Sequence, residues 1–392
     1  MNLVFVTEAR FFRLTDGVIV GDASFDKNLW SRYLKYFTNV YVVARIKEAA
    51  TEIEGKVPVE SPGVTFCDLP YYLGVTEYLR KRGALKHAIS RIINGIEATY
   101  VCRVPGKISD LFITELLSAN KEYGVEVVGD PWDVFAPGAI RHPMRALLRV
   151  TGYLQLRRNI SRAKAVLYVT KTTLQSRYPA RKDVFQIGAS DVKIAGSSLA
   201  PEPKRLSDKT EIIVLSIGSL EQMYKSPDIV LQAVRHLTDR RIPVKLIWLG
   251  DGAYLERMVA YAAELGLSEI VNFKGNVSSD EVKTFLGLAQ VFALVSRTEG
   301  MPRAMIEAMA SALPCIGTRV GGIPELLDDN MLIPKNDYVS LANKIEELIN
   351  NDGLYYQQSQ RNLKEAGSYV ESVLEEKRAQ FYENIKLLAT AH

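Results

Sequence analysis

The chain has 392 residues, of which 47% are hydrophobic and 24% charged, and its formal net charge is +4. This balance is typical of a soluble globular protein, and the length suits two α/β domains better than a single core. No apolar run reaches the roughly 18 residues that a membrane-spanning helix needs. The three cysteines are widely spaced, which favours a reducing compartment over a disulfide framework or a zinc site.

Short apolar runs alternate with amphipathic stretches along the first half of the chain. In chain order they predict strands over 3–7, 40–44, 64–67, 100–104, 125–129 and 165–170, with helices over 26–37, 108–123 and 144–162. The first run lacks the basic n-region and the small-residue cleavage site of a signal peptide. We therefore expect a buried first strand and a cytoplasmic protein.

The second half repeats the alternation more clearly. It predicts strands over 212–217, 244–249, 270–273, 291–295 and 314–318, with helices over 227–237, 254–265, 280–288 and 303–312. Such alternation indicates two Rossmann-like, doubly wound parallel-sheet domains, and we expect the active site in a cleft between them. The predicted domains are 1–194 and 211–368, joined by a linker over 195–210. The last helical stretch, within 369–392, is expected to pack back on the first domain.

The most informative stretch runs from Ser296 to Ala310, where a predicted strand leads through a loop into a helix. Gly300 allows the backbone to approach a ligand closely, and the free N–H groups of the first helical turn can bind an anion or sugar oxygens. Glu299 in the loop and Glu307 in the helix are eight residues apart. Carboxylates are good acceptors for the paired hydroxyls of a ribose or a hexose.

This stretch resembles the Glu-x7-Glu motif of retaining glycosyltransferases with the GT-B fold, of the group 1 or family 4 type. The resemblance continues through Pro314 to the Gly321-Gly322-Ile323-Pro324-Glu325 turn, and it includes Gly250-Asp251-Gly252 and Val271–Gly275 upstream. These motifs cover roughly residues 212–335 in the order and spacing of that family. The resemblance implies the two Rossmann-like domains of the GT-B fold, an N-terminal one that binds the acceptor and a C-terminal one that binds a nucleotide-sugar.

The resemblance also assigns roles to individual residues. Glu299 would contact the transferred sugar and the reacting centre, and Glu307 would hold the donor ribose. The remaining donor contacts would come from Gly300, Met301, Phe273, Asn276, Gly321 and Gly322. For Glu307 alone, an ordinary solvated helix glutamate is the alternative, and for the glycine pair it is a plain turn.

The donor diphosphate needs positive charge as its bond to the sugar breaks. The family usually supplies it from a Gly-Arg-Leu-x-x-x-Lys-Gly loop, and the corresponding stretch here runs from Gly218 to Ser226. Lys225 matches the lysine, whereas Ser219 stands in place of the arginine and Ser226 in place of a glycine. Arg103, at the end of a first-domain strand, is a candidate for the missing contact, with a surface arginine as the alternative.

The first domain departs further from the family. Its first loop reads Thr7-Glu8-Ala9-Arg10 and lacks the usual glycine pair, and Asp130 follows a strand where many relatives have a histidine. Asp130 is a candidate for contact with the sugar or the acceptor, and a helix N-cap is the alternative. Ala312 also replaces a common glycine.

The resemblance implies transfer with retention of configuration, which we expect to proceed by same-face attack with the leaving phosphate accepting the acceptor proton. Lys225 and helix dipoles would stabilise the leaving group. No Asp-x-Asp motif follows a strand, so we expect a metal-independent enzyme without a cofactor.

Residues 134–182 hold eleven Lys and Arg residues and no acidic one, and Arg141, Arg145 and Arg149 recur every four positions. This segment predicts attraction to an anionic membrane surface or a lipid-linked pyrophosphate, at the inner face of the membrane. A solvated helix face is the alternative, and nucleic acid is not expected because no nucleic-acid motif accompanies the charge.

We therefore expect a hexosyltransferase that moves sugar from a UDP- or GDP-linked donor to a saccharide or lipid-linked acceptor in cell-surface polysaccharide or glycolipid synthesis. Two alternatives remain. A nucleotide-sugar epimerase shares the architecture but usually lacks the Glu-x7-Glu motif, and a degenerate GT-B binding protein is supported only by Ser219. An NAD-dependent dehydrogenase has little support, because no Gly-x-Gly-x-x-Gly motif follows the first strand.

Overall fold

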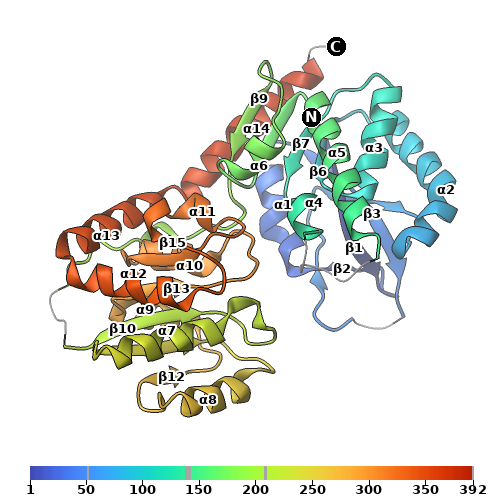
Figure 1. Ribbon diagram of the computed structural model, residues 1–392. Helices are drawn as coiled ribbons and strands as arrows, with labels where there is room; N and C mark the ends of the chain where they lie inside the picture. Colours follow the sequence, from blue (N-terminus) through green and yellow to red (C-terminus); the bar gives the residue numbers. More distant parts are fainter. Residues whose placement is uncertain (51–52, 137–142, 207–209, 391–392) are drawn as a thin grey trace. The chain divides into compact units, whose positions relative to one another are not determined.

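The computed structural model describes residues 1–50, 53–136, 143–206 and 210–390. The chain divides into two compact units, Met1–Ala189 with Glu375–His392 and Ser190–Leu374. Each unit contains a largely parallel sheet with packed helices, so the predicted pair of Rossmann-like domains is confirmed (Figure 1). Among the described residues, no helix combines the length and apolarity that crossing a membrane requires.

The first domain is built on a nine-stranded sheet within the described residues. Its parallel strands are, in spatial order, β5 (Val64–Leu69), β3 (Asn39–Glu48), β1 (Asn2–Arg13), β6 (Thr99–Val104), β7 (Gly124–Val127), β8 (Ala165–Tyr168) and β9 (Phe185–Gly188). Two short antiparallel strands, β2 (Ile19–Gly21) and β4 (Val57–Pro58), extend the sheet beyond β1. The strand order reverses between β1 and β6, which is where ligands bind in sheets of this kind.

Strand β1 is longer than the sequence predicts, and it contains an irregularity. Its first part, Leu3–Val6, pairs with both β3 and β6, whereas its second part, Arg10–Arg13, pairs with β3 and turns into β2. The register shifts between Val6 and Arg10. A bulge of this kind redirects side chains, and here it contains Glu8.

Helices of the first domain surround this sheet. They are α1 (Lys27–Leu34), α2 (Gly74–Gly95), α3 (Lys107–Ser118), α4 (Pro131–Val134), α5 (Arg145–Arg162) and α6 (Thr173–Arg177), with the 3-10 turn η1 (Ala23–Phe25). The last helix, α14 (Glu371–Thr390), contributes aromatic packing to this domain. The ring of Tyr382 lies 5.2 Å from those of Tyr33 and Tyr36, measured between ring centroids.

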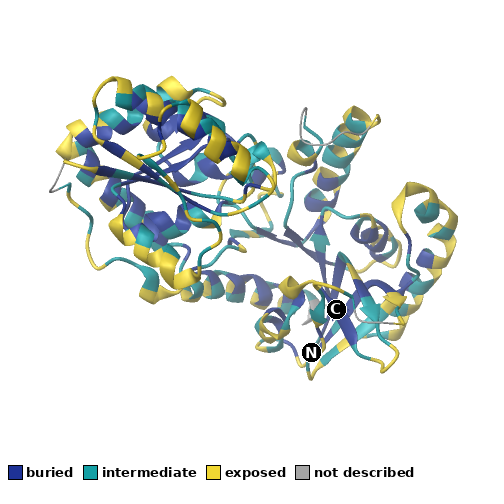
Figure 2. Cartoon of the chain, turned by 90° about the horizontal axis from the view of Figure 1, so that it is seen from below, coloured by how far each residue is buried: buried dark blue, intermediate teal, exposed yellow. Residues whose placement is uncertain are grey.

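In the part of the second domain that the structure describes, the sheet has six parallel strands. Their spatial order is β12 (Val271–Phe273), β11 (Val244–Leu249), β10 (Ile212–Ile217), β13 (Val291–Leu294), β14 (Cys315–Thr318) and β15 (Leu332–Ile333). Most of these strands are apolar and buried, as strands covered on both faces require, and Figure 2 shows a largely buried sheet beneath helices with exposed outer faces. The edge strand β12 is partly exposed. The order reverses between β10 and β13, so the loops after these two strands border the predicted ligand site.

The helices of the second domain follow the predicted alternation. They are η2 (Gly196–Ser198), η3 (Met223–Lys225), α7 (Pro227–Asp239), α8 (Leu255–Glu264), α9 (Ser279–Leu288), α10 (Arg303–Ala310), α11 (Ile323–Leu326), η4 (Asp329–Met331), α12 (Tyr338–Asn350) and α13 (Asp352–Gly367). A capping box starts α9, because Ser278 and Glu281 each accept the other's backbone N–H.

The segment that the sequence predicts as a linker packs against the second domain at several points. The N–H of Ala200 donates to the carbonyl of Ala310 at 2.8 Å. The ammonium of Lys204 donates to three carbonyls at the end of α9, those of Leu286 and Gly287 at 2.9 Å and that of Ala289 at 3.2 Å. Residues 190–206 are therefore an integral part of this domain, and the two units divide after Ala189.

Candidate functional site

The loop after β10 carries Lys225, and close backbone contacts determine its shape. A Cβ on Gly218 would lie 2.8 Å from Cγ of Lys225, so a larger residue there would displace the lysine stem. The indole N–H of Trp248 donates to the carbonyl of Gly218 at 3.0 Å. Gly250, with φ +130°, leaves no room for a side chain either, since its Cβ would lie 2.2 Å from the same carbonyl oxygen. These contacts explain why glycine stands at both positions.

Ser219 occupies the position of the expected arginine, and its side chain forms hydrogen bonds to the backbone of its own loop and of a neighbouring loop. Its hydroxyl accepts the N–H of Glu221 at 3.2 Å and donates to the carbonyl of Asp251 at 3.4 Å. The short polar side chain therefore stabilises the turn without adding positive charge. Ser226, at the end of the same loop, has φ +46°. It keeps the left-handed conformation that a glycine would adopt easily.

Glu299, in the loop after β13, pairs directly with Lys225. Its Oε2 atom forms an ion pair with the ammonium, and both side chains are nearly buried, at 13% and 12% exposed. The hydroxyl of Ser296 donates to the same oxygen at 3.0 Å. The structure therefore brings together the two residues that the resemblance assigns to the reacting centre, at the point where the strand order reverses.

Arg297, which the sequence motifs did not single out, holds the two loops together. Its backbone N–H donates to the carbonyl of Tyr224 at 2.7 Å, and its guanidinium donates to the carbonyl of Met223. The same guanidinium lies 2.8 Å from a carboxylate oxygen of Asp228 and donates to Asn336 at 3.1 Å. A side chain that joins three loops beside Lys225 and Glu299 is a positioning residue. Its place inside the Glu-x7-Glu stretch was the available signal.

The glycine pair Gly321-Gly322 supports the Glu299 loop. Gly321 has φ +53°, and a Cβ there would lie 1.8 Å from the carbonyl oxygen of Glu299. The N–H of Gly322 donates to the carbonyl of Gly300 at 2.8 Å. Both glycines are thus required by the backbone of the loop. Direct donor contact by either of them stays a prediction.

Glu307 lies on α10, the helix that follows this loop. Its carboxylate accepts from the guanidinium of Arg303 at 2.9 Å, one helical turn earlier. Arg303 is 73% exposed, so this pair is weak and a ligand hydroxyl could replace it.

The backbone between Glu299 and α10 is open to approach. Gly300 is exposed, and a Cβ added to it would meet no atom of the described residues within 4 Å. Met301 is half-buried just before the helix. A ligand can therefore reach the main chain at Gly300, as the resemblance implies for the donor.

Phe273 and Asn276 lie at the carboxyl end of β12, the edge strand of the same sheet. Phe273 is half-buried and Asn276 is exposed. The N–H of Gly250 donates to the carbonyl of Gly275 at 2.8 Å, which ties this turn to the loop that contacts Gly218. Because parallel strands end at one edge of the sheet, these residues share an edge with Lys225 and Glu299.

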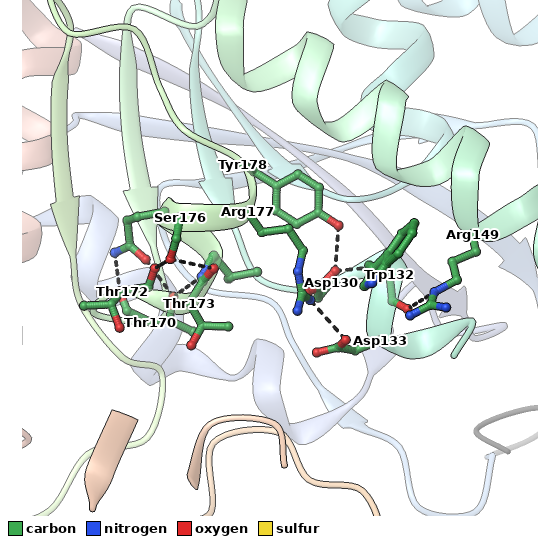
Figure 3. A network of polar contacts seen from close by, with 12 residues as sticks. Asp130, Trp132, Asp133, Arg149, Thr170, Thr172, Thr173, Ser176, Arg177 and Tyr178 are labelled. Carbon is green, nitrogen blue, oxygen red and sulfur yellow. Dashed lines mark hydrogen bonds and ion pairs between the residues drawn. The ribbon is translucent and has the colours of Figure 1, made fainter. Parts of the chain in front are cut away.

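Asp130, in the first domain, caps α4 and binds two further side chains (Figure 3). Its Oδ1 atom accepts the N–H of Trp132 at 2.9 Å and the hydroxyl of Tyr178 at 2.6 Å, while its Oδ2 atom pairs with Arg177. Burial and then the bond to Asp130 raise the pKa of Tyr178 above its usual range. The alternative interpretation as a helix N-cap describes this geometry, and the catalytic role stays a prediction.

Arg103 does not present a free charge either. Its Nε atom lies 3.5 Å from the carboxylate of Glu126, and the two side chains are 16% and 5% exposed. The hydroxyl of Tyr33 donates to the same carboxylate at 2.8 Å. Arg103 therefore balances a buried carboxylate inside the first domain, and this placement gives no support to a phosphate contact.

The described arginines of the predicted basic stripe on α5 form contacts within the first domain. Arg145 donates to the carbonyl of Phe135 at 3.0 Å, and Arg149 donates to that of Trp132 at 2.7 Å. The guanidinium of Arg149 also stacks on the Trp132 ring, 3.9 Å from its centroid. Arg141 lies outside the described residues. The expected membrane-facing stripe is therefore not supported, because these arginines hold the short helix α4.

Comparison with known proteins agrees with this geometry. Residues 201–368 match the family model described as Glycosyl transferases group 1. Protein CapJ of Staphylococcus aureus is 26% identical over 371 residues, which cover 93% of this chain and 90% of that protein. The solved lipopolysaccharide outer core galactosyltransferase WaaB in its apo form has a TM-score of 0.66 at 14% identity, over 100% of this chain and 99% of WaaB. Anabaena Alr3699/HepE in complex with UDP and glucose has a TM-score of 0.58 at 15% identity, over 97% and 98%.

The two solved structures show the fold, and the matched segment contains Lys225, Glu299 and Glu307. The predicted GT-B type of architecture is thereby confirmed. Residues 201–368 are therefore similar to the group 1 glycosyltransferases.

Proposed function

We propose that this glycosyltransferase moves a hexosyl group from a UDP- or GDP-linked donor to a saccharide or lipid-linked acceptor, with retention of anomeric configuration, in cell-surface polysaccharide or glycolipid synthesis. The observation that carries the proposal is the nearly buried pair of Lys225 and Glu299 where the strand order reverses between β10 and β13. A cation and a carboxylate there suit a diphosphate and a sugar, respectively.

Lys225 and Glu299 bind each other, and a bound donor would replace this ion pair by a separate contact to each residue. The diphosphate would take the ammonium of Lys225 from Glu299, and the freed carboxylate would accept hydroxyl groups of the transferred sugar. Arg297 would keep the lysine loop in place during this exchange, because it binds the backbone of Met223 and Tyr224. Binding of the diphosphate would thus prepare the carboxylate for the sugar.

The chemical step needs no base from the protein in this scheme. The bond between the anomeric carbon and the phosphate oxygen breaks while the acceptor hydroxyl attacks from the same face, and the departing phosphate oxygen takes the acceptor proton. Lys225 would offset the charge that develops on the diphosphate, as would the N-terminus of α10. Metal independence and the absence of a cofactor are part of this proposal.

The relatives favour this function without fixing the donor. The HepE structure holds UDP and glucose, and WaaB is a galactosyltransferase of lipopolysaccharide outer core. The HepE name supports UDP and both names support a hexose, so a UDP-hexose is the first donor to test here. A cytoplasmic location at the inner membrane face stays a prediction.

The test is a panel of UDP-, GDP- and ADP-hexoses, measured by thermal shift and by slow hydrolysis with and without EDTA. One donor class should stabilise the wild type and be hydrolysed by it, while Lys225→Met and Glu299→Ala should lower hydrolysis by about 10²-fold or more. Lys344→Met is the matched control, since Lys344 pairs with Glu347 one turn away on α12. No binding by any member would favour a degenerate binding protein, and reversible release of an altered sugar would favour an epimerase.

A further inference from the structure

A cavity of about 630 Å³ lies wholly within the first domain, whereas Lys225 and Glu299 belong to the second. It is lined by Glu8 from the bulge in β1, by Arg45 from β3, and by residues of α2, α3 and α5. Glu8 lies in the bulge of β1 and the start of α3 follows β6, and the strand order reverses between these two strands. The cavity thus occupies the ligand-binding position of a doubly wound sheet.

One wall of this cavity is polar and firmly built. The carboxylate of Glu8 accepts the N–H of Ile108 at 2.8 Å and the hydroxyl of Tyr72 at 3.1 Å. It also lies 2.8 Å from the guanidinium of Arg45. The side chain of Arg45 is 8% exposed, and its Nε atom is buried without a hydrogen-bond partner among the described residues. A buried donor of this kind costs stability unless a ligand or water satisfies it.

Further polar groups complete the same wall. Asp110 accepts from the side-chain amide of Asn159 at 2.7 Å, and Lys107 lies 3.5 Å from its other oxygen. Burial raises the pKa of Asp110. The rings of Tyr72 and Tyr78 lie 5.3 Å apart, measured between centroids. Carboxylates beside aromatic rings offer hydroxyl acceptors and an apolar face together, which is the combination that a pyranose ring requires.

The cavity also has apolar lining residues, here called the apolar wall, and some of them are exposed. Val75 and Leu79, one helical turn apart on α2, are 65% and 60% exposed. Leu111 of α3, which is buried, and Leu148 of α5, which is half-buried, also belong to it. Exposed aliphatic side chains at the rim of a cavity are a signal for an apolar ligand, because covering them removes unfavourable contact with water.

We propose that this cavity binds an amphipathic acceptor, a sugar joined to an aliphatic chain, with the sugar at the polar wall and the chain along Val75, Leu79 and Leu148. The inference rests on the proposed transferase function and specifies its acceptor. A free oligosaccharide would leave the apolar wall uncovered, and a purely apolar ligand would leave Glu8, Asp110 and Lys107 without polar contacts to the ligand. The mixed charges of the wall argue against a polyanion.

Binding to the full-length protein can be measured directly with alkyl glucosides as probes. Hexyl, octyl and decyl glucosides, each below its critical micelle concentration, are compared with free glucose by calorimetry. Affinity should rise by roughly fourfold for each methylene group that the apolar wall covers. Leu79→Ser and Val75→Ser should flatten this dependence on chain length without unfolding the protein, because both side chains are mostly exposed.

Matched controls separate this site from general adhesion of detergent. Val259→Ser on α8 and Leu288→Ser on α9 change side chains that are 49% and 53% exposed in the other domain, and they should preserve the wild-type dependence on chain length. Preference for octyl glucoside over octanol should fall in Asp110→Asn. The proposal would be overturned if Val259→Ser also flattened the dependence of affinity on chain length, or if the wild type showed no such dependence.

The two proposals fail in different ways. If alkyl glucosides bind as described but no nucleotide-sugar is bound or hydrolysed, the cavity binds an amphipathic ligand, but the transferase function is wrong and the ligand is not its acceptor. If nucleotide-sugars are hydrolysed but alkyl glucosides bind no better than glucose, the acceptor class is wrong and the transferase function stands.

Discussion

Replacement of Gly321 by alanine tests whether the glycine pair positions the Glu299 loop. In the wild type, Gly321 has φ +53°, and an added Cβ would lie 1.8 Å from the carbonyl oxygen of Glu299 and 2.6 Å from its carbonyl carbon. The nearest atoms belong to backbone, so no flexible side chain can move aside. The Glu299 loop itself has to shift.

The size of the effect follows from these distances. Ordinary contact begins near 3.4 Å, so the carbonyl must move by about 1.5 Å. A left-handed conformation costs an alanine roughly 1–2 kcal/mol, and crowding adds a similar amount, so the free energy of unfolding should fall by about 2–4 kcal/mol. A displacement of about 1 Å at a reacting group costs roughly 10²-fold in rate. We therefore expect donor hydrolysis to fall by about 10²-fold or more in folded protein.

The assay combines urea unfolding with donor hydrolysis at a temperature where the variant is folded. Gly287→Ala is the control, because no described atom lies within 4 Å of its Cβ position on α9 and alanine favours helix there. The control should be at least as stable as the wild type and equally active. Gly321→Ala with wild-type stability would refute the steric reasoning. Lower stability with wild-type hydrolysis would show that the loop position does not matter for the reaction.

Three further predictions concern the second domain. Gly300→Ala should leave the unfolding free energy within about 0.5 kcal/mol of wild type, since its Cβ meets no described atom, but should weaken donor binding about tenfold in titration if the donor approaches this backbone. Ser226→Gly should raise the free energy of unfolding in urea by about 1 kcal/mol, because it removes the strain of a left-handed serine at φ +46°. A free energy of unfolding below that of the wild type would contradict this. Burial lowers the pKa of Lys204 to about 8 from 10.5, so the unfolded chain keeps this proton above pH 8 and the folded protein does not. The stability of wild type relative to Lys204→Met should therefore rise between pH 8 and 10.5, and a pH-independent difference would contradict the assignment.

Periodicity located the main strands of both sheets because most of them are short apolar runs, and several are buried on both faces. It ended β1 at residue 7, whereas the strand continues through a bulge to Arg13. It also gave no helix over Gly74–Gly95, where α2 forms as a 22-residue helix with a weakly apolar face. Bulges and half-solvated helices depend on neighbouring elements, which local patterns do not contain.

For the candidate site, too, the sequence predicted some features and the structure was needed for others. Sequence motifs alone named Lys225 and Glu299, because glycine, proline and acidic residues recur at fixed positions around a ligand site. They could not show that Ser219 is bound within its loop or that Arg103 faces Glu126. They also could not show that Arg145 and Arg149 bind carbonyls near α4. Whether a charge is free depends on its partners in space.

Local sequence patterns were enough to predict the two-domain α/β architecture and the loops that carry Lys225 and Glu299, because burial periodicity and turn chemistry are local properties. The tertiary structure alone decided which charges meet. It paired Lys225 with Glu299 from loops 74 residues apart, joined those loops through Arg297, and set Glu8 beside the start of α3. These contacts arise where the strand order of a parallel sheet reverses, and that order is fixed only when the strands assemble.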